Sequence, residues 1–184
     1  MTYPMPRPAA ITALIRDKGQ PVDPMLHAAA NLLRDKGMRV AGVAQQARSG
    51  RASCCDDFSL VNLATGARHC ISQDLGSGSK GCRLDYGTLA EAIAEISTAI
   101  TPDTDVLILN RFGYSESQGG GFRPLVEKAL GLNIPVLLSV TRSYHDDWRA
   151  YAGSYATDLP ATSPHVRQWC DAILRASVKI GQEA

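Results

Sequence analysis

Basic and amide side chains follow four of the segments that we predict to be buried β-strands. They are Arg16 and Lys18 after the first segment, Gln45, Gln46, Arg48 and Arg51 after the second, Asn110 and Arg111 after the third, and Thr141 and Arg142 after the last. The carboxyl ends of parallel strands meet at one edge of a sheet, where ligands bind. Guanidinium groups match phosphate-like oxyanions through paired hydrogen bonds. Any single loop cation could simply be solvated, but their coincidence at one edge predicts a site for a small oxyanion.

A glycine- and serine-rich loop over residues 72–83 could add to that site. Its candidate ligand-binding residues are Gln73, Gly76, Ser77, Gly78, Ser79, Lys80 and Arg83. Alternating glycines allow successive backbone N–H groups to point inward as an anion-binding nest, and the hydroxyl and basic side chains add further donors. The alternative interpretation is a flexible surface linker, because richness in glycine and serine is weak support by itself.

The hydrophobic pattern predicts the elements that position these residues, namely an α/β fold with a mostly parallel sheet flanked by helices on both faces. Strands are expected at 11–15, 38–44, 105–110 and 135–140, and helices at 23–36, 85–100, 145–153 and 163–178, with another helix from the 119–121 glycine turn to residue 130. A β-hairpin over residues 58–72, turning at Thr65 and Gly66, is expected as an insertion in the sheet.

Local signals predict where two of the helices begin and end. Asp23 is expected to cap the first helix with Pro24 at its first position, and Gly37 to close it. Thr88 and Glu91 have the spacing of a capping box at the start of the next long helix.

Composition is typical of one ordinary domain. With 184 residues, of which 45% are hydrophobic, the chain can build a core without disulfides or a structural metal. We expect a disordered leader at 1–9 and a single domain over 10–184. A net charge of +1 gives no whole-molecule argument for nucleic acid or an anionic membrane as a partner. No apolar stretch approaches about 20 residues and no secretory signal is recognisable, so a cytoplasmic protein is expected.

Cysteine and histidine form no familiar catalytic or metal-binding pattern. There are five cysteines and no C-x-x-C pair, so reduced and mostly buried thiols are favoured over thiolate ligation of a metal by Cys54, Cys55, Cys70 and Cys82. The four histidines lack metal-ligand spacing, and no serine lies in a G-x-S-x-G motif. We therefore predict neither a catalytic residue nor a metal site from these residue types.

Two motifs carry a resemblance to known families. The order of strands, loops and helices over nearly the whole chain resembles the P-loop nucleotide-binding fold, in its small nucleoside-triphosphatase and molybdopterin-cofactor adapter branches. More closely, QDLGSGSKGCRLD (73–85) and LILNRFGYSESQGGG (107–121) resemble an uncharacterised bacterial family encoded near molybdate uptake systems. The resemblance implies molybdate, tungstate or an oxo-cluster of them as ligand, and molybdenum-cofactor or molybdate-transport proteins as partners.

The chain departs from the P-loop pattern at the positions that handle magnesium and phosphate. A Walker A motif, G-x-x-x-x-G-K-[ST], needs a lysine and a hydroxyl where residues 14–21 have Gln20 and Pro21. Asn110, followed by Arg111, stands where an acidic residue would organise the metal. Because phosphoryl transfer in this fold depends on lysine and magnesium, we do not expect a bound magnesium nucleotide or ordinary ATP or GTP hydrolysis.

Three functions remain open from the sequence. The leading hypothesis is a non-hydrolysing oxyanion-binding protein for the handling, storage or sensing of molybdate or tungstate. The alternative is a nucleotide-binding phosphohydrolase or transferase, in which Lys18, Lys80 or Arg111 replaces the missing lysine and Glu116 or Asp146 orients water. A third is an adapter whose ligand modulates protein contacts. Homo-oligomerisation also stays open, because the aromatic residues Tyr151, Tyr155 and Trp169 could either cover the sheet or form an interface.

Overall fold

One seven-stranded sheet organises the described part of the chain. The computed structural model describes residues 10–46, 59–72 and 84–180, with side chains up to residue 177. The strands are β1 (Ile11–Arg16), β2 (Val40–Gln45), β3 (Ser59–Asn62), β4 (Arg68–Cys70), β5 (Val106–Leu109), β6 (Val136–Thr141) and β7 (Ala156–Pro160). Their order across the sheet is β4-β3-β2-β5-β6-β1-β7. All neighbours from β2 to β7 are parallel, whereas β3 and β4 form an antiparallel hairpin at one edge.

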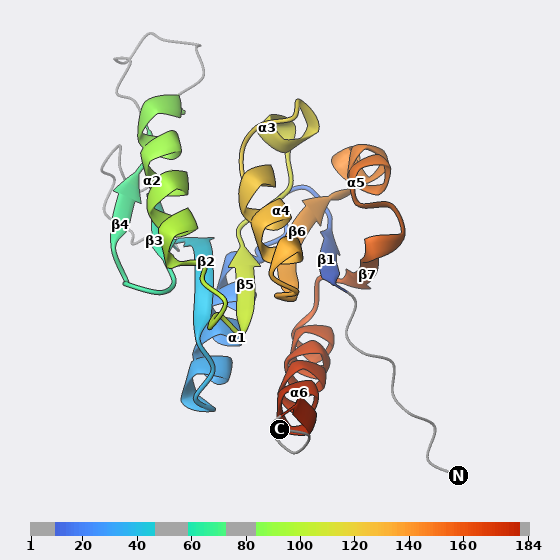
Figure 1. Ribbon diagram of the computed structural model, residues 1–184. Helices are drawn as coiled ribbons and strands as arrows, with labels where there is room; N and C mark the ends of the chain where they lie inside the picture. The colour runs from blue at the N-terminus through green and yellow to red at the C-terminus, as the bar shows by residue number, and fades with distance from the viewer. Residues whose placement is uncertain (1–9, 47–58, 73–83, 181–184) are drawn as a thin grey trace, which may run out of the picture.

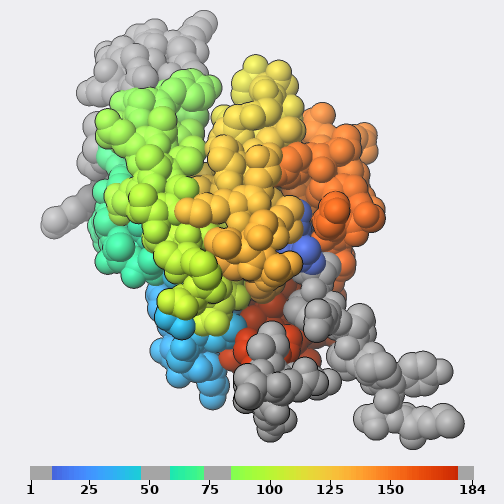
Figure 2. All heavy atoms as spheres, in the orientation of Figure 1, coloured from blue at the N-terminus to red at the C-terminus, as the bar shows by residue number. Residues whose placement is uncertain are grey.

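Helices cover both faces of this sheet (Figure 1). The long helices are α1 (Asp23–Asp35), α2 (Tyr86–Ala99), α4 (Arg123–Gly131), α5 (His145–Ala152) and α6 (Ser163–Ile180), and α3 (Tyr114–Ser117) is a single short turn. Figure 2 shows the face on which α2, α4 and α5 lie side by side over the sheet. Helices α1 and α6 pack on the opposite face. The predicted mostly parallel α/β fold is thereby confirmed, and it is consistent with the P-loop-like architecture.

Alternating side chains of the strands build two hydrophobic layers, one on each face. In β5, Leu107 and Leu109 pack with α2, α4 and α5, whereas Val106 and Ile108 pack with α1 and α6. All four side chains are fully buried, as the continuous apolar run predicts for a central strand. Polar side chains are therefore displaced to the ends of the strands. In Figure 1 the carboxyl ends of β5, β6 and β1 point to the same side of the molecule, toward α3 and α5.

Several sequence predictions need correction. Asp23 does not cap α1, because the N-cap residue is Val22 and no side chain caps the helix; the Asp23 carboxylate instead accepts a hydrogen bond from the backbone N–H of Gln45. The expected capping box of α2 is also wrong, since Asp85 caps that helix by accepting from the N–H of Thr88 at 3.0 Å. The hairpin turning at Thr65 and Gly66 exists, but it extends one edge of the sheet rather than interrupting it.

Candidate functional site

Two arginines from separate strands come together at the carboxyl edge of the sheet. Arg16 is the last residue of β1, and Arg111 follows β5 by two positions. Both side chains are half-buried. Burial, together with the neighbouring charge of Arg111, lowers the pKa of the Arg16 guanidinium. An arginine stays protonated even so, and the effect of the Arg111 charge on Arg16 indicates that the two cations lie near each other.

Amide side chains fix the position of Arg111. Its Nη2 donates to Oε1 of Gln45, the last residue of β2. With the Asn110 amide oriented to satisfy both of its neighbours, its side-chain oxygen accepts from Nε and Nη2 of Arg111, each at 3.2 Å. Asn110 is itself anchored, because its backbone oxygen accepts from Ser139 Oγ at 2.6 Å. Strands β2, β5 and β6 therefore jointly orient this guanidinium.

Several donors of the two arginines have no acceptor within the described residues. Arg16 donates from Nη1 to the backbone oxygen of Gln20 at 3.4 Å, but its Nε is buried without a hydrogen-bond partner there. The contacts of Arg111 engage Nε and Nη2, and no described residue offers an acceptor to Nη1. Neither side chain forms a salt bridge in the described part of the chain. A group that brings several oxygen acceptors would satisfy these donors.

The carboxylate of Asp23 faces the two arginines from the first turn of α1. Its Oδ1 accepts from the Gln45 N–H at 3.3 Å and, in the same orientation of the Asn110 amide, from the Asn110 nitrogen at 2.9 Å. Burial raises the pKa of Asp23, while Arg111, the Gln45 N–H, Arg16 and His27 act in the opposite direction. Sequence analysis missed this residue as part of the site. An acidic residue in the first turn of the helix after β1 was the available signal, because that turn lies at the same sheet edge.

The loop that replaces the Walker A motif is held by its own side chains. Gln20, which stands where that motif has lysine, donates from Nε2 to the backbone oxygen of Ala161 at 2.7 Å and accepts from the N–H of Asp17 at 3.1 Å. Gly19 permits the turn with a φ of +83°. Gln20 therefore offers no cation for a terminal phosphate.

Other predicted site residues lie at the same edge without joining the cluster. Arg142 is exposed and its Nε donates to Asp17 at 2.7 Å, so its charge is already paired. Lys18 is exposed, and Thr141 is half-buried at the end of β6 beside Arg16. The predicted residues outside the described part of the chain are Arg48, Arg51, Gln73, Gly76, Ser77, Gly78, Ser79, Lys80 and Arg83.

Glu116 shapes the backbone after Arg111. It is buried in the short helix α3, and its two carboxylate oxygens accept from the N–H groups of Gly113 and Phe122, each at 2.9 Å. Both oxygens are thus committed to the protein backbone. A water-orienting role, which the enzymatic hypothesis gave to Glu116, does not fit these contacts.

Comparison with known proteins identifies the family of this chain. The sequence matches the family described as "Protein of unknown function (DUF2478)" over residues 11–169. The chain belongs to this family. It is also similar to the "Molybdenum import ATP-binding protein ModC 2" of Bradyrhizobium diazoefficiens, with 29% identity over 162 residues, or 88% of the chain. That name agrees with the predicted resemblance to a molybdate-associated, P-loop-like group.

The relative is a much longer protein, because the DUF2478 chain spans 18% of its length. Its named ATP-binding activity therefore belongs to the whole relative. No solved structure matches the DUF2478 chain at a significant level.

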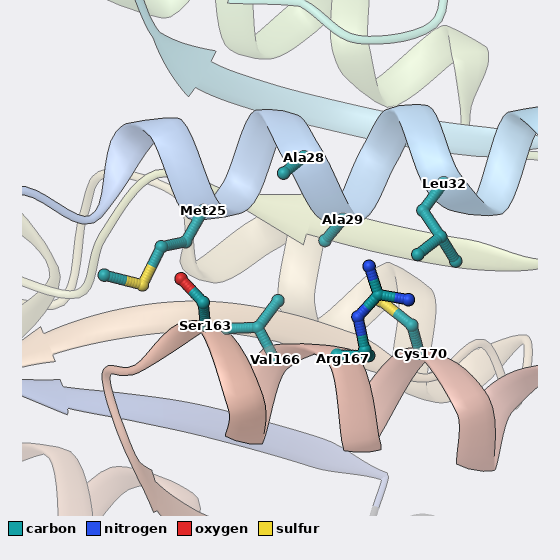
Figure 3. Close-up of a pocket in the computed structure, with 8 residues that line it drawn as sticks. All are labelled: Met25, Ala28, Ala29, Leu32, Ser163, Val166, Arg167 and Cys170. Atoms are coloured by element: carbon teal, nitrogen blue, oxygen red, sulfur yellow. The ribbon is translucent and has the colours of Figure 1, made fainter.

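A pocket lies between α1 and α6 on the described surface. Figure 3 shows that Met25, Ala29 and Leu32 of α1 face Val166 and Cys170 of α6 across it. Ser163 and Arg167 complete the lining with Ala28. The lining is almost entirely apolar and lacks the converging donors of the strand edge. The two arginines therefore remain the better candidate site in this DUF2478 chain.

The described residues hold neither a metal-binding cluster nor a helix able to span a membrane. No group of three or more His, Cys, Asp or Glu side chains there is arranged to hold a metal ion. Of the cysteines proposed as thiolate ligands, only Cys70 falls in the described part, where its Sγ lies 3.3 Å from the hydroxyl of Ser72. None of the helices described has the length and apolar character needed to cross a membrane.

Proposed function

We propose that this DUF2478 protein is a non-hydrolysing oxyanion-binding protein whose ligand is molybdate or tungstate, or an oxo-cluster of them. The observation that carries the proposal is the convergence of Arg16 and Arg111, which form no salt bridge within the described residues and whose donors are incompletely used there. A tetrahedral oxyanion supplies several acceptors in a small volume, which suits two guanidinium groups.

The name of the similar protein, a molybdenum import component, supports molybdenum as the central atom of the bound oxyanion. Handling, storage or sensing of the anion beside a molybdate transport system, with transport or cofactor proteins as partners, is the corresponding role. A cytoplasmic location is part of the same proposal.

A titration tests the proposal directly. The heat of binding would be measured for molybdate, tungstate, sulfate and phosphate with the wild-type protein and with Arg111→Ala. Loss of a hydrogen bond to a charged group costs about 1.5–3 kcal/mol, so the variant should bind at least about tenfold more weakly. Arg39→Ala is the matched control, because Arg39 is an exposed arginine before β2, paired with Asp103 at 3.3 Å, at the opposite end of the sheet. Folded wild-type protein that binds none of the four anions would refute the proposal.

A nucleotide-dependent enzyme is the second candidate, and it draws on the words "ATP-binding" in the name of the similar protein. Gln20 and Asn110 occupy the positions at which magnesium and phosphate are handled, and both amides bond to the protein itself. Release of phosphate from ATP or GTP that depends on magnesium and disappears in Arg111→Ala would favour this candidate over the first.

A further inference from the structure

The negative charge of an ionised Asp23 is unfavourable in a site that binds a dianion. An ionised carboxylate beside the ligand repels it and offsets part of the attraction of Arg16 and Arg111. A simple electrostatic trap would have a neutral or basic group at this position. The contacts of Asp23 give a physical reason for an acid here.

The two oxygens of Asp23 have different surroundings. Oδ1 accepts both hydrogen bonds, from the Asn110 amide and from the Gln45 N–H. Oδ2 accepts from no described residue, yet it belongs to the same half-buried carboxyl group. Oδ2 is thus the oxygen able to carry a proton and donate it to a ligand oxygen.

We propose that the oxyanion binds together with one proton, shared between Asp23 Oδ2 and a ligand oxygen, so that Asp23 is a specificity-determining residue of the site. The inference rests on the proposed function. Molybdate, tungstate and sulfate are dianions without a proton at neutral pH, so the proton is taken from solvent and placed on Asp23. Hydrogen phosphate carries its own proton, so its O–H group donates a hydrogen bond to an ionised Asp23 and no proton is taken from solvent.

The cations around Asp23 favour its ionised form before a ligand binds, so the proton arrives together with the dianion. Arg111 lies beyond Asn110, Arg16 ends β1, and His27 is on the next turn of α1. The His27 ring nitrogen Nε2 lies 2.9 Å from the backbone oxygen of Gln45. Burial already raises the pKa of Asp23, and an arriving dianion acts in the same direction. His27 is the other described titratable side chain facing Asp23, so it must be separated from Asp23 in any test.

Proton uptake can be counted by titrating the protein with molybdate in two buffers of different ionisation heat, at several pH values from about 6.5 to about 8.5. The expected result for the wild type is uptake of about one proton per anion, with affinity falling about tenfold per pH unit where Asp23 is ionised before binding. Asp23→Asn should bind without proton uptake, with a nearly flat pH profile, and more tightly than the wild type at about pH 8.5. His27→Gln should behave as the wild type.

Failure of this inference is distinguishable from failure of the proposed function. Molybdate binding by the wild type with no proton uptake would overturn the role of Asp23 and leave the oxyanion site standing. Uptake that persists in Asp23→Asn and is lost in His27→Gln would also overturn it. Absence of molybdate, tungstate, sulfate and phosphate binding at every pH would refute the proposed function and this inference together.

Discussion

At the scale of single residues, the site combines cations that have spare donors with an acid that is only partly satisfied. Arg111 is oriented by Gln45 and Asn110, and Asp23 accepts from the same two residues. A change in the protonation of Asp23 is therefore felt by the Asn110 side-chain amide and, through it, by Arg111.

The stability of the protein should report on Asp23 even without a ligand. Because its folded pKa lies above the ordinary value of 3.8, the native state holds a proton that the unfolded chain has lost, and the contribution of Asp23 to the unfolding free energy falls as pH rises above that value. Asp23→Asn should thus gain stability relative to the wild type between about pH 4 and pH 7. Urea unfolding of both proteins at about pH 4 and pH 7 measures the unfolding free energy of Asp23→Asn relative to the wild type. A relative stability of the variant that decreases from pH 4 to pH 7 would contradict the raised pKa of Asp23.

Cys170 offers a second test at the residue scale. Burial raises the pKa of its thiol to about 11, with Asp171 acting in the same direction. Because the thiolate is the reactive form, iodoacetamide at about pH 8 should modify Cys170 slowly in the folded protein and rapidly in urea. Mass spectrometry of the Cys170 peptide measures both rates. Equal rates in the two states would show that the thiol is accessible and not held protonated.

At the scale of elements, the sequence predicts the buried strands well because their signals are local. The central strand β5, the helix end at Gly37 and the hairpin turn at Thr65 and Gly66 lie where pattern and turn chemistry place them. Strand β7 was missed, since its five residues, ATDLP, end in proline and alternate without a clear apolar face. It exists because β1 offers it a parallel partner. No local pattern contains that information.

The candidate site shows the same division between local and long-range information. The positions of Arg16 and Arg111 at strand ends follow from strand prediction alone. Pairing of Arg142 with Asp17 joins residues 125 positions apart, and it becomes visible only in three dimensions. The turn of the Asp23 side chain away from the helix end toward Asn110 is likewise a tertiary contact.

Gly42 makes the pairing of β2 with β5 possible, and its replacement is predicted to be severe. A Cβ at this position would lie 1.9 Å from the backbone oxygen of Ile108, and its φ is +119°. Gly42→Ala should lower the unfolding free energy by about 3 kcal/mol or more, from overpacking and backbone strain together. Gly37→Ala, with open space around a φ of +84°, should cost about 1 kcal/mol. Equal costs in chemical unfolding would contradict the close strand approach.

Loss of Glu116 should loosen the connection that carries Arg111. Glu116→Ala leaves the buried N–H groups of Gly113 and Phe122 without their acceptor, which should cost about 2 kcal/mol or more of unfolding free energy. The matched control is Glu127→Ala, because Glu127 is an exposed glutamate on α4, and it should stay within about 0.5 kcal/mol of the wild type. If the two variants unfold alike, Glu116 is not the anchor of this segment.

At the scale of the whole molecule, a net charge of +1 conceals an uneven arrangement of charge. Both faces of the sheet are covered by helices, which leaves the carboxyl edge of the strands as the side where sheets of this type bind ligands. There, Arg142 is paired with Asp17, whereas Arg16 and Arg111 form no salt bridge and, among the described residues, have Asp23 as their acidic neighbour. A near-neutral protein thus concentrates positive charge at one small place, which suits a compact anion rather than a polymer or a membrane surface.

The central claim is that Arg16 and Arg111 hold the same anion. Crystals soaked in tungstate, at a concentration above the dissociation constant measured in solution, would locate the metal by its anomalous scattering. The proposed function predicts a peak within hydrogen-bonding reach of both guanidinium groups through the tungstate oxygens, and its loss in Arg111→Ala crystals. A peak bound elsewhere, or a saturated soak with no peak between the two arginines, would contradict it.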